Sequence, residues 1–208
     1  MRIRSVNVGR AVDAEWAGRL KRTAIDKRPV AGRVSVGGNG LAGDERADVT
    51  HHGHPDQAVY AYAREDYDWW ESQLGRELRD GLFGENLTTV GVDVTGALLG
   101  ERWRVGTAVL EVTGPRTPCA VFRNWMGEPG WVKRFTEAGR PGAYFRVIET
   151  GELGAGDEIE VLERPWPSVT IGEAFAAYHG DKELMRRVLA VPGLGEKWDR
   201  IAARVLGS

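Results

Sequence analysis

The spacing of glycine constrains this chain more than any other feature of its sequence. The 208 residues include 28 glycines. Glycine favours tight turns and weakens helices, so this spacing predicts short strands in place of long helices. Strands bounded by glycine, proline or polar residues are expected at Ile3–Val8, Arg33–Val36, Ala58–Ala63 and Tyr144–Glu149.

Two hairpins are predicted from these patterns. The first joins residues 102–105 to 108–112 through Gly106-Thr107, a pair that suits a two-residue primed turn. The second joins Tyr144–Glu149 to Glu158–Leu162 through the glycine-rich stretch 151–157. Runs of strands with few long helices indicate a mainly β chain with some helix (the α+β class), built as a barrel or a strongly bent sheet.

Helices are expected at two places in this β-rich part, Glu65–Arg79 and Pro129–Ala138. The pattern becomes helical after residues 164–167, where Thr170 and Glu173 have the spacing of a capping box. Three short amphipathic helices follow. The sequence therefore predicts a β domain at residues 1–164 and a three-helix bundle at 165–208.

The charge balance and the cysteine count exclude several classes of protein. The chain has 28 basic and 30 acidic residues, a net charge of −2, which excludes a global field that attracts nucleic acid polymers. The single cysteine allows no internal disulfide, as is usual in a reducing compartment. The first nine residues lack the apolar run of a signal peptide, and no stretch approaches the roughly 20 apolar residues of a membrane span. We therefore expect a cytoplasmic protein without a membrane partner.

The strongest chemical signal is Cys119, which ends the stretch Pro115-Arg116-Thr117-Pro118-Cys119 directly after a predicted strand. Arg116 is close enough in sequence to favour the thiolate, which is the form that binds metals and acts as a nucleophile. A thiolate suits a soft or high-valent metal centre. The alternative is that Cys119 is a small buried apolar residue without a chemical role.

A second candidate is the segment 41–57, which contains three of the four histidines. His52, His54 and Asp48 could form a metal site, but they lack a standard metal-ligand spacing. An ordered loop in which Asp and His side chains bond the backbone is favoured over direct metal ligation. The histidines remain candidates for residues of a binding pocket.

Three further segments have weaker signals. Lys27-Arg28-Pro29 with Arg33 forms a cationic patch that suits a phosphate or is simply solvated. Asn86 lies in a turn-like segment, Phe83–Leu87, where an asparagine can bond its own backbone. Residues 38–43 match G-x-G-x-x-G, but no apolar helical face follows, so the Rossmann interpretation is rejected.

Taken in order, these segments resemble YiiM-type members of the MOSC family over nearly the whole chain. Each segment is short, and their ordered set is specific. The matching segments are Ser5–Gly9, Lys27–Gly32 without Ala31, Gly40–Asp44 without Ala42, Asp48, His52-Gly53, Ala58–Tyr62 without Ala61, Phe83–Leu87, Pro115–Cys119 without Thr117, and Tyr144–Val147 without Phe145. The helical tail is also similar to a three-helix extension of this subfamily.

The resemblance implies a distorted, closed β-barrel core and a molybdenum cofactor, with Cys119 as the metal ligand. Candidates for the cofactor's phosphate are Lys27, Arg28, Arg116 and Arg146. His52 and Asn86 become candidates for contacts with the pterin or the substrate, and Arg116 or His52 for charge stabilisation or proton donation.

The implied activity is the reduction of small N-hydroxylated compounds such as hydroxylaminopurines, hydroxylamines or amidoximes. Because the chain lacks a cluster-binding cysteine set, electrons must come from a separate flavin or iron–sulfur protein. Pyridoxal phosphate is not expected, since the domain that holds it in cofactor sulfurases has no counterpart here. Two alternatives stay open: a non-catalytic carrier of the cofactor or of sulfur, and a hydrolase with Cys119 as nucleophile and His52 as base.

The chain departs from the family pattern at Ala24 with Asp26, at His54 and at Gln57. Gln57 stands where lysine is usual, which removes a cation from a loop expected near an anionic ligand. If that lysine contacts the phosphate in relatives, Arg28 must compensate or the affinity must be lower here.

Overall fold

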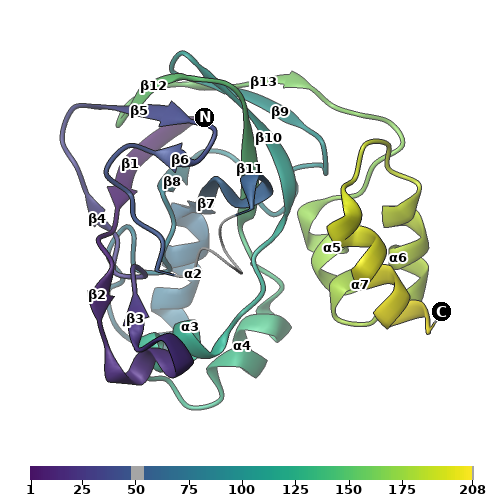
Figure 1. Cartoon of the computed structure of the whole chain (residues 1–208), viewed down its shortest axis with the longest axis horizontal. Coiled ribbons are helices and arrows are strands. Elements are labelled where there is room, and N and C mark those ends of the chain that lie inside the picture. Colours follow the sequence, from purple (N-terminus) through teal and green to yellow (C-terminus); the bar gives the residue numbers. More distant parts are fainter. Residues whose placement is uncertain (48–53, 208) are drawn as a thin grey trace.

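The computed structural model describes residues 1–47 and 54–207, and its centre is an eight-stranded sheet (Figure 1). The strand order is β13-β9-β10-β11-β7-β8-β1-β4, with every pair antiparallel except the parallel pair β7–β8. The strands are β1 (Arg2–Val8), β4 (Arg28–Pro29), β7 (Val59–Ala63), β8 (Leu87–Val90), β9 (Arg102–Val105), β10 (Ala108–Pro115), β11 (Ala143–Glu149) and β13 (Ile159–Glu163). The predicted mainly β architecture with helices is confirmed.

The sheet curves so that β1 lies against the residues directly before β13. Arg2 and Glu158 form an isolated bridge, and the Ile3 amide donates to the Asp157 carbonyl at 2.9 Å. Within residues 1–47 and 54–207, the regular ladders run from β13 to β4, and this short seam is the contact between β1 and the residues before β13. The closed barrel that the resemblance implies stays a prediction.

Two small sheets accompany the large one, and one of them corrects a predicted hairpin. They contain β12 (Gly151–Gly154), β5 (Arg33–Gly37) and β6 (Gly40–Leu41), and β2 (Val12–Asp13) with β3 (Arg22–Thr23). The hairpin between residues 102–105 and 108–112 is confirmed. The second prediction was wrong, because β11 pairs with β10 along one edge and, at residues 143–145, with β7 along the other. The chain instead forms β12 against β5, and then β13 against β9.

Helices cover one side of the sheet and form the C-terminal tail. They are η1 (Glu15–Leu20), η2 (Pro55–Gln57), α2 (Arg64–Leu74), α3 (Ala120–Met126), α4 (Trp131–Ala138), α5 (Ile171–Tyr178), α6 (Lys182–Leu189) and α7 (Glu196–Leu206). The helix predicted to reach Arg79 ends at Leu74, because Gly75 adopts a left-handed conformation (φ 66°) and its amide bonds Glu71. The capping box of Thr170 and Glu173 is confirmed.

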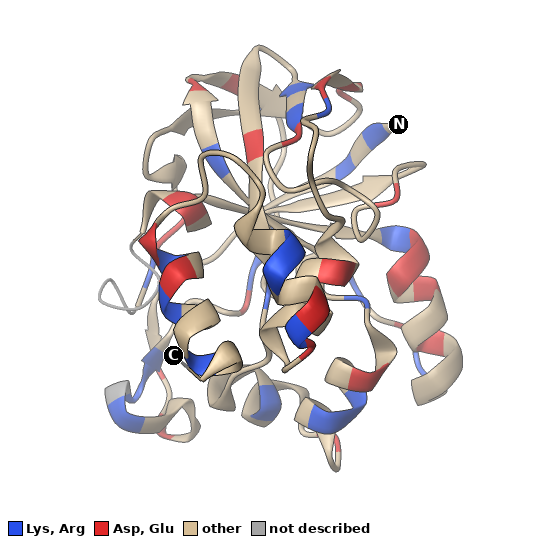
Figure 2. Ribbon diagram, turned by 90° about the vertical axis from the view of Figure 1, so that its right-hand side faces the viewer, with Lys and Arg blue, Asp and Glu red and all other residues tan. Residues whose placement is uncertain are grey.

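The tail helices α5–α7 lie side by side beside the sheet (Figure 1), and they carry interspersed acidic and basic residues (Figure 2). Their buried residues, such as Ala174 and Trp198, belong to the same hydrophobic cluster as Leu110 of the sheet. The division at residues 164 and 165 stays a prediction. Of the helices described, none is both long and apolar enough to cross a membrane.

A second, aromatic cluster joins the sheet to α2, α3 and α4. Trp70 stacks on Phe135 with ring centroids 6.1 Å apart, and its indole nitrogen donates to the Tyr62 hydroxyl at 2.9 Å. Tyr62 and Tyr67 are completely buried here, and burial raises the pKa of both phenols well above the ordinary value. This cluster forms one wall behind the segment that contains Cys119, since Phe122 of α3 belongs to it.

The buried phenols make stability fall at alkaline pH. Above about pH 10 tyrosines ionise in the unfolded chain, whereas Tyr62 and Tyr67 keep their protons in the folded state. The free energy of unfolding should therefore fall by about 1.4 kcal/mol per pH unit for each such tyrosine. Urea titrations over a pH series should show a shallower fall for Tyr62→Phe than for the wild type. Equal slopes in the two proteins would contradict this expectation.

Candidate functional site

A cavity of about 180 Å³ lies where the segment after β10 meets the loops around β3, β6 and β7. Its lining includes one thiol, four cationic side chains and two tyrosines. These are Cys119, Arg22, Lys27, Arg46, Arg116, Tyr60 and Tyr144. The cavity therefore combines a soft nucleophile with an excess of positive charge and flat aromatic surfaces.

Cys119 is held at the first turn of α3. It is the N-cap residue of that helix, with extended backbone angles, and its sulfur accepts a hydrogen bond from the Phe122 amide at 3.5 Å. The side chain is half-buried and lines the cavity. Pro115 ends β10 directly before this segment, so a rigid strand and a helix start fix the thiol from both sides.

Arg116 lines the same cavity and is only 7% exposed. Its guanidinium lies 4.0 Å from the ring centroid of Phe122 and 5.2 Å from that of Tyr60, and it donates to the Phe83 carbonyl. Among the described residues, no carboxylate lies within 4.0 Å of it. Burial disfavours its charge, but the phenols of Tyr60 and Tyr144 keep its pKa raised. A buried cation without a carboxylate partner is a strong attractor for an anionic ligand.

Lys27, in contrast, already has an anionic partner. Its ammonium bonds the Asp44 carboxylate, which also accepts from the Gly9 amide at 2.8 Å and from the Asn86 side chain at 2.9 Å. Burial lowers the pKa of Lys27, although Asp44 opposes this effect. Asn86 also accepts from the Tyr60 amide at 3.1 Å, so the predicted local turn bond is replaced by long-range bonds that brace the cavity wall.

Two cations of the cavity, Arg22 and Arg46, were not predicted from the sequence. The Arg46 guanidinium donates to the Asn39 carbonyl at 2.6 Å and to the Ala58 carbonyl at 3.3 Å. Arg46 follows the Gly43-Asp44 pair of the family pattern, but the acidic residues around it in the sequence give no local sign of a cationic site. Gln57, which stands where relatives were expected to carry lysine, also lines the cavity.

The other predicted site residues lie elsewhere. Arg28 is absent from the cavity lining, and its largely exposed side chain pairs with Asp26. Arg146 contacts Glu111 and Asp56 beside a second, much smaller cavity of about 20 Å³. Local sequence could not separate these cations from Arg116, because long-range strand pairing decides which of them face the cavity.

The histidine-rich segment is only partly described. His52 and Asp48 lie outside the described residues. His54 caps η2, where its ring nitrogen accepts from the Asp56 amide at 3.2 Å. Within residues 1–47 and 54–207, no group of three or more histidine, cysteine or acidic side chains could hold a metal ion, and no histidine lines the larger cavity.

Known proteins are similar to this chain along most of its length. Residues 48–160 match the MOSC domain. The chain belongs to the MOSC family. It is 35% identical to YflK of Bacillus subtilis (93% of this chain, 89% of YflK) and 32% identical to YiiM of Escherichia coli (86% of this chain, 83% of YiiM).

The solved structures show the same MOSC relationship. The crystal structure of YiiM from Geobacillus stearothermophilus superposes with a TM-score of 0.81 at 29% identity, over 99% of this chain and 98% of that one.

A further relative by sequence is a reductase of Gibberella moniliformis, which is 35% identical over 74% of this chain but only 30% of its own length. The predicted membership of the YiiM-type MOSC family is confirmed.

Proposed function

We propose that this chain is a molybdenum-cofactor-dependent reductase of small N-hydroxylated compounds, supplied with electrons by a separate flavin or iron–sulfur protein. The observation that supports it best is that Arg116 and Cys119 line the same cavity. Arg116 is buried and, among the described residues, has no carboxylate partner, and Cys119 is the chain's only cysteine. The MOSC family is associated with this cofactor, and one relative is named a reductase.

The residues of the cavity fit such a cofactor. The cofactor carries a phosphate, and Arg116 offers a planar set of donors of which, among the described residues, Phe83 occupies only one. Arg46 and Arg22 add positive charge at the same cavity. A thiolate is an appropriate ligand for molybdenum, and Cys119 lines the same wall. Tyr60 and Tyr144 present aromatic surface to the planar pterin.

The chain's own residues would bind the cofactor, orient the substrate, and supply hydrogen-bond donors to it. When bound, the cofactor supplies two-electron redox chemistry. Reduction of an N-hydroxyl group to an amine consumes two electrons and two protons and releases water. Burial raises the pKa of Tyr144, so its hydroxyl stays protonated and would donate a hydrogen bond to the substrate's oxygen. Arg116 stabilises negative charge that develops on that oxygen.

The first test measures molybdenum and pterin in the wild-type protein, purified gently from a host that makes the cofactor. We expect near-stoichiometric metal, and turnover of an N-hydroxylated purine when an artificial electron donor is added. Metal without turnover of any N-hydroxylated substrate would support the carrier alternative. Neither metal nor pterin would refute the cofactor assignment, provided that a known molybdenum enzyme from the same host is loaded.

A further inference from the structure

The wall of the cavity meets the C-terminal tail at Thr113, near the end of β10. The Thr113 hydroxyl lies 2.5 Å from the Asp56 carbonyl oxygen and 3.0 Å from the Tyr144 carbonyl oxygen, and its one hydrogen is shared between these two acceptors. The Thr113 carbonyl accepts from the indole nitrogen of Trp198 at 3.2 Å. One residue thus joins η2, β11 and α7, and Tyr144 of β11 lines the cavity.

The tail contacts β10 where that strand is irregular. The register between β10 and β11 shifts between Val112 and Gly114, so Thr113 lies in a bulge-like position. Bulges redirect the side chains that follow them. Trp198 is 3% exposed and packs on Gly114, where a Cβ would lie 3.3 Å from the indole ring. Arg116 and Cys119 follow within five residues of this contact.

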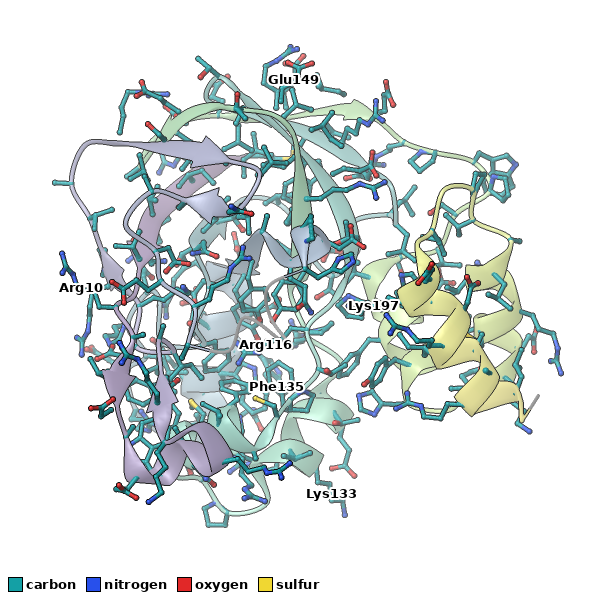
Figure 3. The ribbon with its side chains drawn as sticks, viewed as in Figure 1. Arg10, Arg116, Lys133, Phe135, Glu149 and Lys197 are labelled. Atoms are coloured by element: carbon teal, nitrogen blue, oxygen red, sulfur yellow. The ribbon has the colours of Figure 1, made fainter. Side chains whose placement is uncertain are left out.

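A second contact links the tail to the other side of the cavity. The Asp56 carboxylate lies 3.6 Å from the Arg146 guanidinium, and a Cβ at Gly195, the N-cap of α7, would lie 3.6 Å from the same carboxylate. The pKa of Lys197 in α7 is lowered, because the effect of burial outweighs the attraction of Asp56. Figure 3 shows Lys197 at the junction between the tail and the sheet. Gln57, the residue after Asp56, lines the cavity. The tail therefore contacts two wall segments from behind.

We propose that the C-terminal helices position the cavity wall, with Trp198 as the positioning residue that holds the bulged end of β10 and, through it, Arg116 and Cys119. The tail then belongs to the functional site although none of its described residues, 165–207, lines the cavity. This inference rests on the proposed function in one respect: it takes this cavity as the functional site. The contacts themselves require no cofactor.

The single cysteine provides a direct test in the cofactor-free protein. Trp198→Phe removes the indole donor and part of the ring that packs on Gly114. The end of β10 should then open more often, and a small alkylating reagent should label Cys119 about fivefold faster, equivalent to about 1 kcal/mol. Labelling at the wild-type rate would overturn the proposal. This outcome is distinct from failure of the cofactor assignment, which metal analysis measures.

Two control variants separate positioning from general loosening. Trp166→Phe makes the same substitution at a side chain that is 89% exposed, and should leave the labelling rate unchanged. Leu153→Ala creates a cavity at β12, which pairs with β5 and lies outside the tail, and should lower stability without accelerating labelling. If Leu153→Ala accelerates labelling as much as Trp198→Phe does, the proposal fails.

A measurement on the wild-type chain covers the case in which Trp198→Phe does not fold. Hydrogen exchange should show the amide of Gly114 in β10 and the amide of Arg123, which donates to the Cys119 carbonyl, opening together with those of α7, because the two segments share the Thr113 contact. Opening of these two amides independently of α7 would overturn the proposal.

Discussion

Replacing Cys119 with alanine or serine should empty the protein of molybdenum and abolish reduction of N-hydroxylated substrates. Removing residues that merely support a metal ligand typically costs 10–100-fold in affinity, so removing the ligand itself should cost more than about 100-fold. Metal analysis of purified protein, followed by turnover with an artificial donor, measures both effects. Pterin content should fall less than metal content, since the arginines remain.

The two substitutions at Cys119 control for folding. The sulfur accepts from the Phe122 amide as the N-cap of α3, and alanine removes this acceptor. Serine restores an oxygen acceptor at the cap, so Cys119→Ser should unfold at a temperature no lower than wild type. A folded Cys119→Ser protein that retains metal and turns over substrate at the wild-type rate would refute the ligand assignment.

The second large effect is expected at Arg116. Arg116→Gln removes a buried cation that, among the described residues, lacks a carboxylate partner, while the amide can still donate to the Phe83 carbonyl. Truncating a buried partner of an anion costs about 2–5 kcal/mol, so the protein should retain the cofactor at least about 30-fold more weakly. Pterin and phosphate retained after dialysis measure the loss.

Arg28→Gln is the matched control for this prediction. Arg28 carries the same charge, but its exposed side chain pairs with Asp26 outside the cavity lining. An exposed ion pair contributes little, so cofactor retention should change by less than about threefold. Stronger loss in Arg28→Gln than in Arg116→Gln would move the phosphate site to the outer surface of β4.

Local elements were predictable wherever a short segment contains its own structural signal. The turn at Gly106-Thr107 needs only its own backbone freedom, and the capping box of Thr170 and Glu173 needs only one helical turn. The end of α2 was misplaced because the apolar spacing continues past Gly75, whose left-handed backbone ends the helix. The second hairpin failed because strand pairing depends on which edges are already occupied, and local composition does not record that.

The sequence by itself determined the mainly β architecture with a helical tail, the family, and Cys119 as the residue to examine, because glycine spacing, helix caps and an ordered set of motifs are local properties. Only the tertiary structure decided which charges face the cavity. Arg116 and Arg46 line it, Lys27 lines it already paired with Asp44, and Arg28 and Arg146 lie outside it. The physical reason is that burial and ion pairing depend on contacts between residues far apart in the chain. The contact of Trp198 with Thr113, 85 residues away, is of the same kind.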